Sequence, residues 1–134
     1  MRYWACLPCT VFLVAILGCP RSDGVTPPPS AKVSGSIKLD GKPMPGGEIR
    51  FSVSGFPPKT LQVTDGSFSG EVFSGKNQVE ASYEKEGAPH PMDPKTKLKV
   101  NVISPKYSGP NSPLNKELTA GENPPLSFEV TSKK

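Results

Sequence analysis

One stretch decides the fold class of this chain: Val33-Ser-Gly-Ser-Ile-Lys-Leu-Asp-Gly-Lys-Pro-Met-Pro-Gly-Gly-Glu-Ile-Arg-Phe51. Polar and apolar residues alternate in its two arms, with apolar side chains at Val33, Ile37 and Leu39 and again at Ile49, Phe51 and Val53. This alternation is typical of β-strands that bury one face. The segment between the arms, residues 40–47, is rich in Gly and Pro, which favour chain reversal. The stretch therefore predicts two strands of an antiparallel fold, joined by a Pro-stiffened loop.

The same alternation continues along the chain. Residues 60–64 and 67–72 alternate on either side of Asp65-Gly66, a dipeptide typical of two-residue hairpin turns. It returns in residues 78–83, and then in two further sets of apolar positions: Leu98, Val100 and Val102, and Leu126, Phe128 and Val130. Between these sets, Glu84–Lys95 is polar and contains three Pro, which predicts a long exposed loop. Such spacing of short strands predicts an all-β domain, a β-sandwich of about seven antiparallel strands.

Composition agrees with a single small β-domain. The 134 residues include 17 Pro and 13 Gly, and these residues interrupt nearly every candidate helix after residue 19. Only 34% of the chain is hydrophobic, which predicts a thin core. The net charge of +4 comes from scattered lysines, of which Lys95, Lys97 and Lys99 form the densest group. A nucleic-acid partner is not expected, because such a partner requires clustered basic residues with a base-reading element.

The N-terminus has the features of a secretion signal. Arg2 precedes the apolar run Thr10–Leu17, which is too short to span a bilayer. The run ends in Ile16-Leu17-Gly18-Cys19, which resembles the lipobox of bacterial lipoproteins. The resemblance implies cleavage between Gly18 and Cys19 and attachment of lipid to the Cys19 thiol. The alternative is an ordinary signal peptide that happens to end beside a cysteine.

The cysteine distribution favours the lipobox. All three cysteines, Cys6, Cys9 and Cys19, precede residue 20, so the domain offers Cys19 no disulfide partner. We therefore expect a signal peptide at residues 1–18, a lipidated Cys19 and Pro-rich linker at 19–31, and the β-domain at 32–134. Pro-rich segments act as semi-rigid spacers. The expected location is extracytoplasmic, with the protein anchored to a membrane by the lipid on Cys19.

The domain also resembles a known family. The residues that carry the likeness are Gly35–Phe51, the turn Thr64-Asp65-Gly66-Ser67-Phe68, and the tail Pro105-Lys-Tyr107, Ala120-Gly-Glu-Asn123 and Phe128-Glu-Val130. They are similar to carboxypeptidase regulatory-like domains, and the tail is similar to small planctomycete-type lipoproteins that carry this domain after a lipobox. The resemblance implies a transthyretin-like (prealbumin-like) sandwich. It implies no catalytic residue, because the family shares no enzymatic activity.

The residues themselves suggest no catalytic or metal site. His90 is the only histidine, so a zinc site with several His or Cys ligands is not expected. No nucleophile-elbow context accompanies a possible triad of a serine with His90 and Asp93. Asp40 and Asp65 precede Gly in turns but lack the spacing of a calcium loop. We therefore predict a protein that is not an enzyme, with no cofactor and no bound metal.

Two functions remain open from the sequence. The first is a non-enzymatic interaction or structural module of the cell envelope, with Pro43–Gly47 and Glu84–Lys97 as its contact loops. The second is a carbohydrate- or small-ligand-binding domain at the cell surface, which would require aromatic side chains exposed on one face. The corresponding partners are an envelope protein or a polysaccharide. Catalysis by a hydrolase or hydroxyisourate-type site is disfavoured, because Arg50 is the only arginine beyond the linker and His90 the only histidine.

Overall fold

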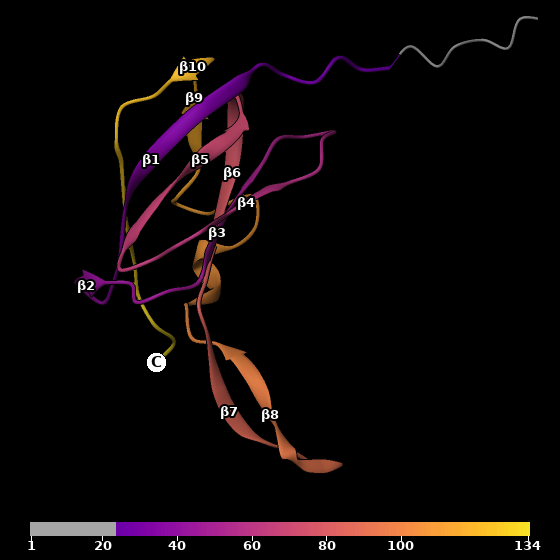
Figure 1. Cartoon of the computed structure of the whole chain (residues 1–134), viewed down its shortest axis with the longest axis vertical. Helices are drawn as coiled ribbons and strands as arrows, with labels where there is room; N and C mark the ends of the chain where they lie inside the picture. The colour runs from indigo at the N-terminus through magenta and orange to yellow at the C-terminus, as the bar shows by residue number, and fades with distance from the viewer. Residues whose placement is uncertain (1–23) are drawn as a thin grey trace, which may run out of the picture.

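A computed structural model describes residues 24–134 and has an all-β architecture in this range. Two sheets pack face to face around a common core, and a separate two-stranded sheet extends away from them (Figure 1). The predicted signal peptide, residues 1–18, and Cys19 lie outside the described residues. Strand β1 begins at Ser30 and Ala31 is buried, so the β-domain begins two residues before the expected boundary at residue 32.

The first sheet is centred on β1 (Ser30–Leu39). One edge of β1 pairs antiparallel with β2 (Lys42–Pro43) and β5 (Ser67–Phe73). The other edge pairs in parallel with β10 (Gly121–Glu122) and β11 (Leu126–Val130). The expectation of a purely antiparallel fold is therefore wrong. Alternation in a strand identifies its buried face, but it carries no information on the direction of the neighbouring strand.

The second sheet has the order β4–β3–β6–β9 and is antiparallel throughout. Its strands are β4 (Lys59–Gln62), β3 (Glu48–Ser52), β6 (Gly75–Ser82) and β9 (Lys116–Leu118). With β7 (Glu84–His90) and β8 (Asp93–Asn101), the described residues form eleven strands, some of only two residues, in place of the seven expected. A short 3₁₀ helix, η1 (Pro105–Tyr107), buries Tyr107 against the core.

The core lies between the two sheets and follows the alternation of the sequence. The first sheet contributes Val33, Ile37 and Phe68, and the second contributes Ile49 and Phe51. Ring centroids of Phe51 and Phe68 lie 6.3 Å apart, so the aromatic side chains meet across the two layers. Burial of each such large apolar side chain contributes about 1.5–3 kcal/mol to folding.

The segment 33–51 forms two strands, as predicted, but they do not form a hairpin. β1 and β3 belong to different sheets, and residues 40–47 cross from one sheet to the other. Met44 is fully buried within this crossing, and its backbone N–H donates to the carbonyl of Ile37 (3.1 Å). The crossing segment is therefore anchored in the core. Two strands that follow each other in the sequence, each with alternating polar and apolar residues, can face each other across a core or pair edge to edge.

The Asp65-Gly66 turn is confirmed. Both residues have positive φ, 49° and 75°, as a two-residue hairpin turn requires, and Thr64 and Ser67 exchange two backbone hydrogen bonds of 2.9 Å. Beyond this single bridge the flanking strands separate, because β4 pairs with β3 and β5 pairs with β1. The turn thus links the two sheets.

The prediction of a long loop at Glu84–Lys95 is wrong, because these residues form β7 and the first part of β8. Leu98 and Val100 alternate as the core strands do, but they do not face the core. Their side chains remain 40% and 44% exposed, since β7 and β8 extend beyond both large sheets. The alternation is a true strand signal, but no layer of the domain covers the face that it marks.

Candidate functional site

The hairpin of β7 and β8, hereafter the arm, is the most prominent surface feature of the domain. It projects from the end opposite to that where residues 24–29 enter β1 (Figure 1). Asn101 holds its base, because the Oδ1 atom accepts hydrogen bonds from the N–H groups of Tyr83 and Ile103, both 3.1 Å. A backbone bond from Val102 N–H to the Tyr83 carbonyl (2.9 Å) closes the same junction. The arm therefore leaves the sandwich at a defined point.

The two faces of the arm differ in chemistry. Glu86 and Lys97 lie on one face and form an ion pair with an Nζ–Oε2 distance of 2.7 Å. The other face carries Leu98 and Val100, and Lys85 lies directly opposite Val100 in the register. A β-carbon on Gly87 would meet the Val100 side chain, so Val100 packs over a position with no side chain. One face is thus charged and paired internally, and the other is apolar and open.

The tip of the arm is ordered by its own hydrogen bonds. The carboxylate of Asp93 accepts from the hydroxyl of Thr96 (2.7 Å) and from the N–H of Lys95 (3.1 Å). These bonds lower the pKa of Asp93 below its ordinary value. Nδ1 of His90 accepts from the N–H of Met92 (3.2 Å), and Met92 is 90% exposed. His90 and Asp93 therefore shape a turn that presents Met92 to solvent.

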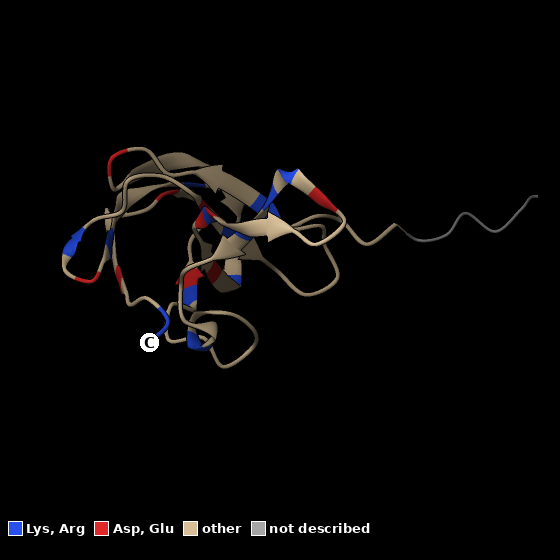
Figure 2. Ribbon diagram, turned by 90° about the horizontal axis from the view of Figure 1, so that it is seen from below, with Lys and Arg blue, Asp and Glu red and all other residues tan. Residues whose placement is uncertain are grey.

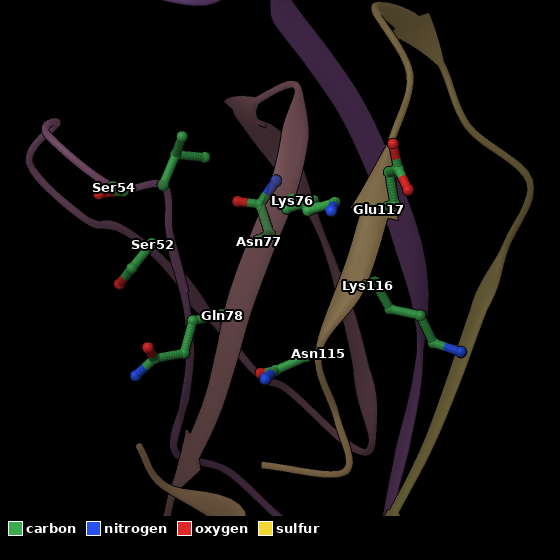
Figure 3. A pocket seen from close by; sticks show the side chains of 9 residues that line it. Ser52, Ser54, Lys76, Asn77, Gln78, Asn115, Lys116 and Glu117 are labelled. Carbon is green, nitrogen blue, oxygen red and sulfur yellow. The ribbon is translucent and has the colours of Figure 1, made fainter. Parts of the chain in front are cut away.

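A second surface feature is a groove of about 600 Å³ beside β6 (Figure 3). It is lined by Ser52 and Ser54 on one side and by Asn115 and Lys116 on the other, with Asn77 between them. The groove lies where β3 has ended, because Ser52 and Gln78 form the last pair between β3 and β6. Serine, asparagine and lysine side chains there offer both donors and acceptors of hydrogen bonds.

The remaining candidate residues lie in turns or in the core. Asp40 and Asp65 both occupy turn positions with positive φ. The N–H of Ser132 donates to the Asp40 carboxylate (3.0 Å) and thereby lowers its pKa. Pro43–Gly47, expected as a contact loop, contains the buried Met44. Within residues 24–134, no group of three or more His, Cys, Asp or Glu could hold a metal ion.

The aromatic residues form no sugar platform within the described chain. Phe51, Phe68 and Phe128 are buried in the core. Phe56 and Phe73 pack on each other with ring centroids 5.7 Å apart, and both are half-buried. Basic and acidic side chains are interspersed over the domain (Figure 2).

Sequence reasoning missed both surface features. The arm was missed because Pro89, Pro91 and Pro94 argue against strand structure, although alternation of Lys with Leu98 and Val100 was visible. One part of the arm was predicted: lysine at every second position indicates an exposed strand face, and Lys95, Lys97 and Lys99 lie exposed on β8. No sequence signal indicates the groove, because it depends on where β3 ends beside β6.

Comparison with known proteins finds no matching family model, no matching curated protein and no matching solved structure. No helix in residues 24–134 is long and apolar enough to cross a membrane. The class that the fold defines is an all-β domain of two packed sheets with a projecting two-stranded arm.

Proposed function

We propose that this chain is a non-enzymatic, membrane-anchored envelope lipoprotein whose arm binds an extracytoplasmic partner protein. The observation that carries the proposal is the uncovered apolar face of the arm, with Leu98 and Val100 each more than one-third exposed. An isolated two-stranded hairpin is at best marginally stable in water. Burial of this face against a partner would supply the apolar contact that the domain itself does not provide.

The arm is suited to bind through its face and not through its edges. Exposed strand edges readily pair with other chains, and natural proteins block them with lysines, prolines and bulges. The arm has all three: the lysines of β8, Pro89 and Pro94, and a register shift between Glu86 and Pro89. We therefore assign binding to the face that carries Leu98 and Val100.

The charge of this face defines the partner's chemistry. Lys85 borders the apolar pair, and its Nζ lies 5.4 Å from the ring centroid of Tyr83. The complementary surface is an apolar patch with carboxylates at its rim, because an acidic rim would pair with Lys85. The partner is a protein, since apolar side chains on a strand face contact other apolar side chains.

The anchoring half of the proposal rests on Ile16-Leu17-Gly18-Cys19 and on the Pro-rich linker. The linker enters the domain at one end and the arm leaves at the other (Figure 1). A tether at Cys19 would therefore direct the arm away from its own membrane. The resemblance to carboxypeptidase regulatory-like, transthyretin-like domains supports a module without catalysis, and the lone His90 agrees with that.

Site-directed photo-crosslinking in cells that make the full chain tests the proposal. A photo-reactive amino acid at Leu98 or Val100 should capture one envelope protein, whereas the same group at Lys99, on the opposite face, should not. Leu98→Asp should abolish capture from position 100 and leave the fold intact, as measured by circular dichroism. Equal capture from both faces would contradict the proposal. Capture of only a second copy of this chain would replace the partner with self-association.

A further inference from the structure

We propose that the outer edge of β11 binds an extended, acidic peptide segment of a partner protein, which adds one short strand to the first sheet. β11 is an edge strand, because it pairs with β1 and with no other strand of residues 24–134. Unpaired backbone groups at such an edge are a template for a further strand. This site is separate from the arm and does not depend on the function proposed above.

The pairing of β11 with β1 shows which backbone groups of the edge are free. The N–H of Asp40 donates to the carbonyl of Val130 (2.9 Å), so Val130 directs its backbone groups toward β1. Successive residues of a strand direct these groups to opposite edges, so Ser127 and Glu129 direct theirs away from β1. Both residues are exposed, and no strand of residues 24–134 pairs with them on that side.

The neighbouring edge, in the second sheet, is closed. Beyond β9, two side chains bond to the backbone of Val79 in β6. Ser112 Oγ donates to the Val79 carbonyl (2.8 Å), and the Val79 N–H donates to Asn115 Oδ1 (2.9 Å). These bonds fix residues 112–115, which form one wall of a pocket of about 400 Å³ whose other wall is β11. This pocket, hereafter the edge pocket, therefore lies directly beside the free backbone groups.

The edge pocket can receive a side chain of the added strand. The three buried residues that line it, Tyr107, Leu114 and Phe128, form a largely apolar floor, and the exposed Pro113 lies beside them. A strand added to β11 would direct every second side chain to this side of the sheet. In strand addition, main-chain hydrogen bonds supply affinity and pockets for alternate side chains supply specificity. An apolar residue of the peptide therefore fits the edge pocket.

The charges at the rim define the rest of the peptide. Lys106, Lys116 and Glu129 line the edge pocket, and neither lysine forms an ion pair within residues 24–134. Lys106 Nζ lies 4.8 Å from the ring centroid of Tyr107, over the floor. Glu129 lies opposite Lys38 in the β1–β11 register, so it belongs to the outer face of the sheet. An acidic residue of the peptide would therefore be favoured on the side of the lysines.

The free edge is short, which limits the occupant. Two prolines, at 124–125, precede β11, and after β11 the chain is paired again, because the N–H of Ser104 donates to the carbonyl of Thr131 (2.9 Å). The outward groups between these limits are those of Ser127 and Glu129. A second copy of this chain is a poorer occupant, because its own residues 105–116 would meet the wall of the edge pocket when the two edges pair.

Titration of the ¹⁵N-labelled full chain with a defined peptide, followed by NMR and amide hydrogen exchange, tests the site. The probe is acetyl-Thr-Val-Thr-Glu-Thr-Val-Thr-amide, which places Val and Glu on one face of a strand. In the free chain, the amides of Ser127 and Glu129 should exchange faster than that of Phe128, whose N–H faces β1. The peptide should slow this exchange and shift both amides saturably, without shifts at Leu98. The same peptide with Lys in place of Glu should bind about tenfold more weakly.

Two substitutions at one position separate the backbone from the side chain. Glu129→Pro removes the outward N–H, and proline is tolerated in an edge strand where this side faces solvent. It should weaken peptide binding about tenfold or more. Glu129→Ala keeps the N–H and should bind at least as tightly as the parent. Lys106→Glu should also weaken binding, whereas Lys42→Glu, an exposed position in β2 on the other edge of β1, should not.

Three results would overturn the proposal. These are an absence of shifts at Ser127 and Glu129 with the probe, undiminished binding by a Glu129→Pro variant that is folded by circular dichroism, and equal binding of the Glu and Lys peptides. Undiminished binding by Lys106→Glu would contradict the assigned charge in the same way. Protection of the two amides that rises with protein concentration alone would replace the peptide with a second copy. None of these results bears on the arm, whose function is read by crosslinking from Leu98.

Discussion

At the scale of single residues, Gly35 allows β1 and β11 to approach each other closely in the first sheet. It pairs with Leu126, where β11 begins to pair with β1. A β-carbon at this position would collide with the backbone of Leu126, which cannot move without disturbing the β1–β11 register. Gly35→Ala should therefore lower the free energy of unfolding by about 1–3 kcal/mol, the cost of overpacking. Urea unfolding followed by circular dichroism measures the difference.

The control for Gly35 is Gly24, which lies before β1 and has open space around its α-carbon. Gly24→Ala should change the free energy of unfolding by less than about 0.5 kcal/mol. If Gly35→Ala is as stable as the parent, the close approach of β1 and β11 is not a constraint on this fold. The family resemblance marks Gly35 only as part of a motif, and the contact with β11 supplies the physical reason for a glycine there.

At the scale of elements, the arm should be separable from the domain. No core residue falls between Glu84 and Asn101, and the arm's main contacts are between its own two strands. Replacement of residues 85–100 by Asn-Gly keeps the cross-strand pair Glu84–Asn101, which a two-residue turn can join. The shortened chain should unfold within about 1 kcal/mol of the parent in a urea titration, since surface changes outside the core have small effects.

The shortened chain should also lose the crosslinked partner. A loss of more than about 3 kcal/mol, comparable to removal of a core side chain, would mean that the arm supports the sandwich. Leu98→Asp in the full-length chain gives the independent comparison. It changes the open face without altering chain length, so its stability should match that of the parent.

The elements also mark the limit of what the sequence could predict. Alternation correctly identified the strands around Ile37, Phe51 and Phe128 and the side that each buries. It did not identify partners: β1 and β3 are neighbours in sequence yet lie in opposite sheets, and the loop between them is anchored by Met44. Leu98 and Val100 have the same pattern as core strands, because period two reports strand geometry and not whether another layer covers the strand.

The candidate sites were less predictable than the fold for a related reason. The groove beside β6 exists because β3 stops at Ser52 and because β6 extends past Gln78 to Gly75. Each of these conditions arises from three-dimensional neighbours, and none leaves a motif in the sequence. The open face of the arm likewise exists because no other strand or loop of residues 24–134 covers Val100.

At the scale of the whole molecule, the linker and the arm act at opposite ends of the domain (Figure 1). A Pro-rich linker between Cys19 and β1, extended at ~3 Å per residue, would place the domain roughly 30 Å from the lipid surface. Anchoring would also raise the effective concentration of the arm toward partners in the same envelope layer. Lipidation at Cys19 would thus bear on partner binding through the anchor.

Cys19→Ser tests this coupling. The variant should leave the membrane fraction, or accumulate as an uncleaved precursor, because only the cysteine thiol can accept the lipid. Cys9→Ser, within the predicted signal peptide, should be processed and anchored like the parent. In any released protein, crosslinking from position 98 should fall even though the arm is unchanged, since the local concentration from the anchor is lost. Undiminished membrane association of Cys19→Ser would contradict the lipobox. Release without loss of crosslinking would show that the arm binds its partner tightly enough to need no tether.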